Sequence, residues 1–371
     1  MTEKIDIAEA TEIILSDESI TVAGAEISES DPEAVVTLVL NGVDINCDIA
    51  PAVIFYNVYE CGSTEEADAT NTVDTTAAGA NVYILDGTDN NITGSHVARI
   101  YESYVLNEEG TEVVDSKKLH KYDAAFYSKM TMNVDGAENT RGVLNIDADN
   151  EGLDSELHLT INGGNINIES GNDGINTNED GISVTTLNGG TLTAEANSTS
   201  MDGGIDSDMG IYINGGTVYA TGNMLDLISE SSQNYVVMGF AQSQQAGSSY
   251  ELKNEANEVV ASYTPGNNFS YMIMSNADIS EGTYTFWQGE TQLAGMEGEG
   301  GGMMMPGGFD ISQMPEGMEI PKGMEIPEDF DPSQMPQNGG RPEMVRCQRE
   351  WRFQKVLLHP RCRKMAKCLR V

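Results

Sequence analysis

A turn motif returns at a fixed interval in the middle of the chain, and this regularity limits the possible folds more than any other feature. The triad Asn-Gly-Gly begins at Asn162, Asn188 and Asn214, so successive copies are 26 residues apart. Alternating apolar residues precede and follow each triad, which is the pattern of a strand with one buried face. A second turn unit, Asp-Gly-Ile-Asn at 173–176 in one copy, separates the strand pairs. The cycle of strand, turn, strand and turn predicts a stacked repeat fold.

A parallel β-helix accounts for this cycle better than a meander of hairpins. A meander also uses Asn-Gly turns, but it gives no reason for the same two turns to recur with the same residues. In stacked coils, like residues lie above one another, so Asn side chains can form ladders and Gly can adopt positive φ. Few segments have a helical pattern. We therefore predict an all-β protein, a parallel β-helix or β-solenoid.

Composition divides the chain into three parts. We expect residues 12–290 to form the β-helix domain, with 233–290 as its C-terminal β cap, because the Asn-Gly-Gly triad stops there while strand-like runs continue. Residues 291–340 are rich in Met, Gly, Pro and Glu and contain short internal repeats. Such a segment cannot bury a core, so we expect a disordered extension. Residues 341–371 are basic, and we interpret them as the product of a shifted reading frame; the alternative is a real basic anchor.

The charge argues against unassisted binding to nucleic acid or to an anionic membrane surface. The chain has 59 Asp and Glu against 19 Lys and Arg, a net charge of −40, and residues 1–340 alone carry −48. We therefore expect no nucleic acid as a partner. No apolar run is long enough for a transmembrane helix, so we expect no membrane insertion, and we expect a monomer. The first 12 residues contain no signal peptide as written. A cytoplasmic protein, a start upstream and a removed signal all remain open at this point.

Several of these segments resemble the sequences of a known protein family. The coils LTINGGNINIESGNDGINTNEDGISVTTLNGGTLTAEA (159–196) and GGIDSDMGIYINGGTVYATGN (203–223) resemble a family of secreted bacterial carbohydrate-binding parallel β-helix proteins of the clostridial cellulose- and polygalacturonate-binding type. The opening TLVLNGVDI (37–45) and residues 261–290 fit as well. The resemblance implies a right-handed β-helix related in fold to pectate lyases, bound Ca²⁺, an extracellular or cell-surface location, and binding of cellulose or pectic acid without demonstrated cleavage. The basic end is not a feature of that family.

The acidic turn units are the candidate metal site. Stacked coils place oxygens of successive turns about 4.8 Å apart. Like charges at that distance repel one another unless a cation bridges them, and Ca²⁺ accepts six to eight oxygen ligands. The alternative is that these residues are solvated and only form turns. The expected ligands are Asp147, Asp149, Glu151, Asp154, Asp173, Asn176, Asn178, Asp180, Asp202, Asp206 and Asp208.

Aromatic side chains on the coils are the candidate sugar contacts. Tyr212 and Tyr219 each lie between apolar residues that face the core, so both are expected to point outward and to stack along one face. The alternative is that they are only exposed strand formers. The expected carbohydrate-binding residues are Tyr122, Phe126, Tyr127, Tyr212 and Tyr219.

Cleavage by β-elimination would need a base, for which the coils offer Lys129 or Arg141. The alternative for both is compensation of the acidic surface. We therefore expect Ca²⁺-assisted, non-catalytic binding of plant cell-wall polysaccharide. Two other functions remain open, a Ca²⁺-dependent polysaccharide lyase and a surface adhesin or structural β-solenoid.

Overall fold

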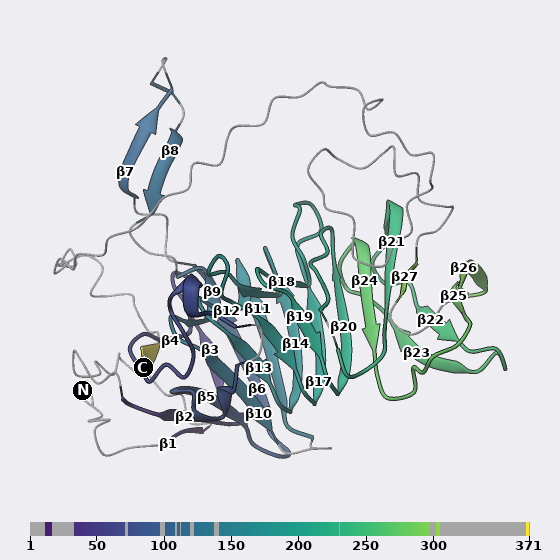
Figure 1. Ribbon diagram of the computed structural model, residues 1–371, viewed down its shortest axis with the longest axis horizontal. Coiled ribbons are helices and arrows are strands. Elements are labelled where there is room, and N and C mark those ends of the chain that lie inside the picture. The colour runs from purple at the N-terminus through teal and green to yellow at the C-terminus, as the bar shows by residue number, and fades with distance from the viewer. Residues whose placement is uncertain are drawn as a thin grey trace. The chain divides into compact units, whose positions relative to one another are not determined.

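The computed structural model describes a protein made almost wholly of β structure (Figure 1). The described residues are 12–16, 33–70, 73–96, 101–107, 110–111, 113–118, 122–136, 141–229, 231–296, 302–304 and 369–370. Their helical turns are the short 3-10 helices η1 (Glu66–Asp68) and η2 (Thr75–Ala77). In this part of the chain, no helix has the length and apolar character needed to cross a membrane. The predictions for 291–340 and 341–371 fall almost entirely outside the described residues.

Three sheets, named A, B and C here, contain the repeated strands. Sheet A has the order β1 (Glu12–Ser16), β2 (Val36–Asn41), β5 (Ala80–Ile84), β10 (Met132–Gly136), β13 (Leu159–Ile161), β16 (Thr185–Leu187) and β19 (Ile211–Ile213). Sheet B has the order β3 (Asp44–Asn46), β6 (Asp89–Gly94), β11 (Val143–Ala148), β14 (Asn165–Ser170), β17 (Thr191–Glu195), β20 (Thr217–Gly222), β24 (Phe269–Ser275), β21 (Tyr235–Gln244) and β27 (Gly302–Met304). Sheet C has the order β28 (Leu369–Arg370), β4 (Val53–Phe55), β9 (Ala124–Ser128), β12 (Glu151–Ser155), β15 (Ile175–Thr177) and β18 (Ile205–Ser207).

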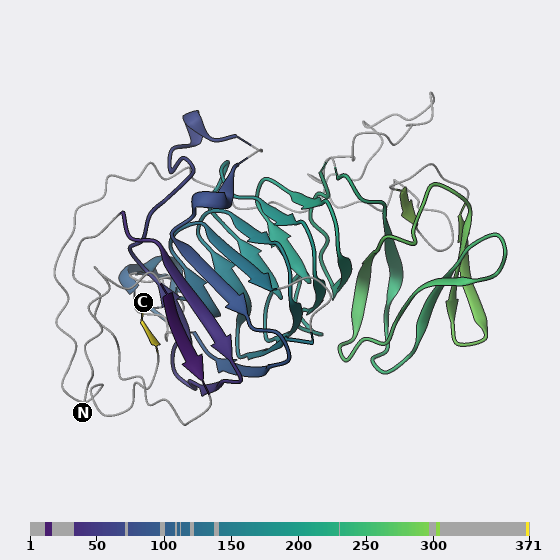
Figure 2. The same cartoon turned by 90° about the horizontal axis from the view of Figure 1, so that it is seen from below.

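The chain visits these sheets in a fixed rotation. From β10 to β20, consecutive strands belong to sheets A, B and C in turn, and each pairs in parallel with the strand one circuit earlier. Figure 2 shows these strands side by side, with their arrows pointing the same way within each sheet. The prediction of an all-β protein with parallel strands is confirmed. The sheets do not close on themselves within the described residues.

Two further sheets lie outside this rotation. The terminal sheet is antiparallel and has the order β23 (Val259–Tyr263), β22 (Tyr250–Lys253), β25 (Tyr284–Gln288) and β26 (Thr291–Met296). It shares a core that includes Tyr250, Phe269 and Phe286 with strands β21 and β24. Because β24 pairs antiparallel with β20, the uninterrupted run of parallel pairings from β3 ends at β20. Strands β7 (Tyr101–Leu106) and β8 (Val113–Lys118) form a separate hairpin.

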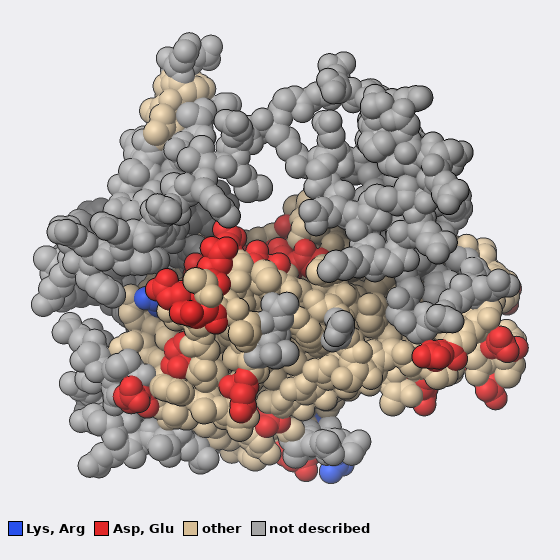
Figure 3. Space-filling view, viewed as in Figure 1, with Lys and Arg blue, Asp and Glu red and all other residues tan. Residues whose placement is uncertain are grey.

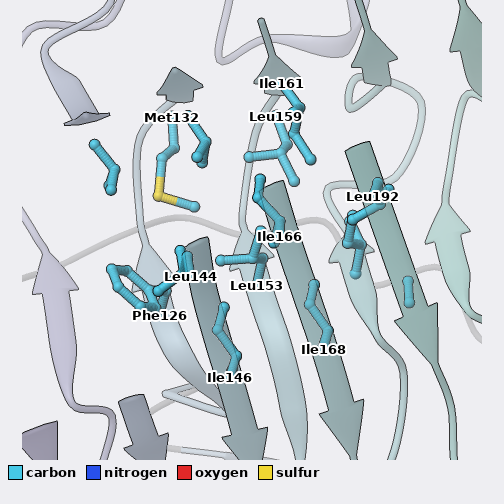
Figure 4. Close-up of a cluster of buried hydrophobic side chains, with 14 of the residues drawn as sticks. Phe126, Met132, Leu144, Ile146, Leu153, Leu159, Ile161, Ile166, Ile168 and Leu192 are labelled. Carbon is cyan, nitrogen blue, oxygen red and sulfur yellow. The ribbon is translucent and has the colours of Figure 1, made fainter. Parts of the chain in front are cut away.

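The main core lies between sheets A, B and C (Figure 4). Its members alternate with polar residues along strands such as β14, and register places them in rows, as in Ile166, Leu192 and Val218 of neighbouring strands. Leu153 of sheet C and Leu159 of sheet A are fully buried. Full burial of each such side chain contributes about 1.5–3 kcal/mol, so the rows provide most of the driving force for stacking.

The Asn-Gly-Gly turns stack as predicted. Asn188 Nδ2 donates to Asn162 Oδ1 at 3.0 Å, and Asn214 Nδ2 donates to Asn188 Oδ1 at 3.1 Å. Gly190 has a φ of 77°, and a Cβ added there would lie 2.4 Å from the carbonyl oxygen of Gly164. The turn therefore needs glycine for two reasons, the left-handed backbone and the close approach of the neighbouring circuit.

Substituting Gly190 tests this packing. Gly247 is a matched control, because it has the same φ of 77° but nothing within 4 Å of an added Cβ. Gly247→Ala should cost about 1–2 kcal/mol of unfolding free energy, which is the cost of the left-handed backbone alone. Gly190→Ala should cost at least twice as much in urea denaturation, because a backbone carbonyl must also move. Equal losses in the two variants would contradict the close stacking of circuits.

Candidate functional site

Sheet C carries a row of polar groups on the side away from the core. Leu153, Ile175 and Ile205 are register partners that face the core. The next residues along these strands, Asp154, Asn176 and Asp206, are also register partners, and strand alternation directs them to the opposite face. We call the carboxylates gathered here the acidic face, and its members are Glu151, Asp154, Asp173, Asp206 and Asp226.

Amide groups connect the carboxylates of successive circuits. Asn176 Nδ2 donates to Glu151 Oε1 at 3.0 Å, and Asn178 Nδ2 donates to Asp154 Oδ1 at 3.3 Å. The backbone N–H of Gly203 donates to Asp173 Oδ1 at 2.6 Å. Although they belong to an acidic surface, Glu151 and Asp173 are each 5% exposed and Asp154 is wholly buried. These acids are therefore ordered parts of the fold rather than solvated turn residues.

Asp226 completes the acidic face and was not predicted from the sequence. It lies after β20, beyond the last Asn-Gly-Gly triad, where no Asp-Gly-Ile motif marks it. Its Oδ2 accepts from the backbone N–H of Ser207, and its side chain hydrogen-bonds that of Asp206. Burial, this hydrogen bond and the charge of Asp226 raise the pKa of Asp206 to about 9. Burial raises the pKa of Asp173 to about 7, and the charges of Asp202 and Asp226 add to this effect.

The predicted metal ligands do not all lie on this face. Asp147 is exposed on β11 of sheet B, and Asp149 Oδ2 lies 3.0 Å from His96 Nδ1. Asp180 and Asp208 are exposed, and Asp208 accepts from the backbone N–H of Gly181. Within the described residues, no group of three or more His, Cys, Asp or Glu side chains has the arrangement of a metal site. Bound Ca²⁺ therefore stays a prediction.

Two of the predicted sugar contacts are wrong. Phe126 is wholly buried in the main core and Tyr127 is 3% exposed, so neither presents a ring face to solvent. The outer side of β9 is covered, because Tyr122 packs edge-on against Tyr127 at 4.9 Å between ring centroids and Tyr127 Oη donates to Glu156 Oε1. Tyr122 itself is half-buried.

Tyr212 and Tyr219 do point away from the core, as predicted, but they do not share a face. Tyr212 lies in β19 of sheet A and Tyr219 in β20 of sheet B. Tyr219 stacks on Tyr263 of the terminal sheet, with 4.9 Å between ring centroids and 6° between ring planes. Stacking along one face is therefore found for Tyr219 and Tyr263, not for Tyr212 and Tyr219.

The two candidate bases lie next to strands of different sheets. Lys129 directly follows β9 of sheet C, and its Nζ lies 5.1 Å from the centre of the Tyr56 ring. Arg141 precedes β11 of sheet B, and its backbone N–H donates to Asp86 Oδ1 at 3.1 Å. Because Tyr127 of β9 is the register partner of Asp154, Lys129 is the candidate that belongs to the same sheet as the acidic face.

Among the charged side chains of the visible described surface, acidic ones are in the majority (Figure 3). Figure 3 shows Asp and Glu gathered in groups on the viewed face, with very few Lys or Arg among them. An anionic sugar would meet repulsion there unless a cation intervened.

Comparison with known proteins gives one match. A family model described as "Carbohydrate-binding domain-containing protein" matches residues 3–264, which include the strands of sheets A and C up to β19 and the parallel strands of sheet B. No curated protein and no solved structure matches the chain.

The acidic face predicts an unusual dependence of stability on pH. With chelator present, native Asp206 and Asp173 hold protons up to about pH 9 and 7, whereas the same groups in the unfolded chain lose theirs near 3.8. Between these values the native state binds more protons, so the free energy of unfolding should fall as pH rises from 5 to 9. Each extra bound proton contributes about 1.4 kcal/mol per pH unit.

Urea denaturation at several pH values measures this slope. Asp206→Asn should flatten it, while Asp278→Asn, at an exposed position, should leave it unchanged. A free energy of unfolding that is constant or rises over this range, or the same slope in Asp206→Asn and the unsubstituted protein, would refute the assignment.

Proposed function

Because the chain belongs to the family of carbohydrate-binding domain-containing proteins, we propose that it binds polysaccharide of the plant cell wall, cellulose or pectic acid, without cleaving it. The family match carries this proposal, since it extends over most of the repeated strands. The protein acts outside the cell or at the cell surface, as a monomer. Binding takes place along the outer side of sheet C, where polar groups repeat at the spacing of the circuits.

The fold we propose for this function is a right-handed parallel β-helix. The rotation of the chain through sheets A, B and C supports it, as do the parallel register and the ladder from Asn162 to Asn214. A repeated surface of this kind suits an extended polymer, because each circuit offers the same groups to successive sugar units.

Calcium is the proposed cofactor. Asp206 and Asp226 place two carboxylates in direct contact, and Asp173 is close enough to influence the pKa of Asp206. Hard carboxylate oxygens are the ligands that Ca²⁺ prefers, and the ion takes the place of protons that these acids otherwise hold. When bound, it neutralises the acidic face and supplies a bridge to the carboxylate of a pectic sugar.

A polysaccharide lyase is the second candidate. Lys129 favours it, because this lysine belongs to the same sheet as the acidic face and lies over the Tyr56 ring. Its amine would remove the proton next to the uronate carboxylate. A structural solenoid without sugar specificity is the remaining alternative.

Retention on insoluble polysaccharide tests the proposal. The protein should be retained on cellulose or pectin, and chelator should weaken retention on pectin. A double variant, Asp206→Asn with Asp226→Asn, should lose about tenfold in affinity for pectin, equivalent to ~1.4 kcal/mol. Asp278→Asn is the matched control, because it removes an exposed carboxylate from another part of the fold.

Three outcomes would contradict parts of this proposal. No retention on either polymer favours the structural solenoid. Retention on pectin that is unchanged by chelator and by the double variant would contradict the proposed role of Ca²⁺. Growth of ultraviolet absorbance from unsaturated product with polygalacturonate and Ca²⁺, lost in Lys129→Ala and kept in Arg141→Ala, establishes the lyase instead.

A further inference from the structure

A cavity of about 320 Å³ lies on sheet B, away from the acidic face. Its walls come from the ends of β14 and β17, from the residues that follow β17, and from the loop after β23. Residues that line it are Glu169, Glu195, Asn197, Ser198, Gly266 and Asn267. It thus joins the repeated strands to a loop some 70 residues further along the chain, and none of these residues belongs to the proposed calcium site.

One buried carboxylate is held in a fixed orientation in this cavity. Glu195 is 7% exposed, and its Oε1 accepts from Tyr263 Oη and from the backbone N–H of Gly266, the latter at 2.8 Å. Its Oε2 accepts no hydrogen bond from the described residues. A Cβ at Gly266 would lie 2.9 Å from this oxygen, so glycine at this position keeps Oε2 open to the cavity.

The aromatic stack fixes the hydroxyl that orients Glu195. The Tyr263 ring lies flat against that of Tyr219, and burial together with the charge of Glu195 raises the pKa of Tyr263. Tyr263 therefore stays a hydrogen-bond donor to Glu195 over the whole physiological range. Such preorganisation reduces the entropy that a ligand would lose on binding to this carboxylate.

The side-chain amides of the wall are engaged within the protein. Asn267 Nδ2 donates to the carbonyl oxygen of Ala196 at 2.8 Å, and Thr221 Oγ1 donates to Asn267 Oδ1 at 2.7 Å. Asn197 Nδ2 donates to the carbonyl oxygen of Gly171 at 2.6 Å. The amide of Asn267 is thus fully engaged and that of Asn197 is engaged in part, whereas Oε2 of Glu195 remains an acceptor. The cavity therefore favours a ligand that brings donors of its own.

The charge of the cavity wall further limits the chemical class of the ligand. Glu169 is the register partner of Glu195 on the adjacent strand, so the two residues lie about 4.8 Å apart along the sheet. No Lys or Arg lines the cavity. A uronate carboxylate placed here would meet two like charges, one of them largely removed from water, whereas hydroxyl and ammonium groups would find acceptors.

We propose that this cavity binds a pyranose unit that carries hydroxyl or amino groups and no carboxylate. Glu195 Oε2 accepts from the sugar, and Glu169 supplies a second acceptor. This inference rests on the proposed carbohydrate binding and adds a second contact, on sheet B, that selects against uronic acids. Neutral and amino sugars share the donor chemistry, and the choice of oligosaccharide distinguishes them.

Calorimetric titration with three hexasaccharides tests whether the cavity binds a sugar without a carboxylate. The probes are β-1,4-linked hexamers of glucose and of glucosamine, and the hexamer of galacturonic acid, with chelator present to silence Ca²⁺ bridging. The full chain should bind at least one of the first two more tightly than the third. Glu195→Gln keeps the shape and turns the open acceptor into a donor, so affinity for the preferred hexamer should fall about tenfold or more.

Two further variants make the result specific. Gly266→Ala places a methyl group against Oε2 and should weaken the same hexamer, even if Glu195→Gln disturbs folding. Glu290→Gln, at an exposed turn of the terminal sheet, is the matched control and should bind as the unsubstituted protein does.

The outcomes separate this inference from the proposed function. If the protein is retained on cellulose or pectin but Glu195→Gln and Gly266→Ala bind the hexamer with unchanged affinity, the inferred sugar binding in the cavity is overturned. The proposed function is then left intact. The inferred sugar binding in the cavity is also overturned if the galacturonate hexamer binds as tightly as the other two or more tightly, or if no hexamer binds. No retention on either polymer overturns the proposed function, and the cavity inference fails with it.

Discussion

The parallel hydrogen-bonded register between successive circuits is the constraint on which the rest of the structure depends. It places each residue beside its equivalent one circuit earlier, so whatever a position carries is repeated along the sheet. Apolar positions become buried rows, as with Ile175 and Ile205, and asparagines become ladders, as with Asn162 and Asn188. The same rule forces acids together wherever the sequence repeats them.

The fold therefore brings acidic side chains close together, and the protein must compensate the repulsion between them. On sheet C, amides such as Asn176 bridge to Glu151, and Asp206 shares a hydrogen bond with Asp226. On sheet B, Glu195, the register partner of Glu169, accepts from a tyrosine hydroxyl and a backbone N–H instead. The two solutions give two surfaces of different chemistry. We propose a divalent cation as the ligand of the first and a sugar that brings hydrogen-bond donors as the ligand of the second.

The sequence predicted what depends on local repetition and missed what depends on distant packing. Strand alternation was enough to place Tyr212 and Tyr219 on outer faces, and the Asn-Gly-Gly spacing was enough to predict the ladder. The predicted sugar contacts failed at Phe126, whose side chain joins the main core, and at Tyr127, because Tyr122 and Tyr56 cover the outer side of that strand.

Partners far apart in the sequence were not predictable for the same reason. The hydroxyl that orients Glu195 comes from Tyr263, 68 residues away, in a part of the chain without the repeat. Asp226 also lies outside any motif, yet it changes the pKa of Asp206 more than any other charge does. Residues outside the repeat thus complete both candidate sites, and only the folded arrangement identifies them.

We propose that the acidic face holds protons which a divalent cation replaces on binding. Calorimetric titration of Ca²⁺ into chelator-treated protein at pH 6.5, repeated in buffers of different ionisation enthalpy, measures the protons released for each ion bound. We expect binding that releases about one proton or more per ion, and a smaller release in Asp206→Asn. Binding without proton release, or no binding of Ca²⁺ at all, would contradict it.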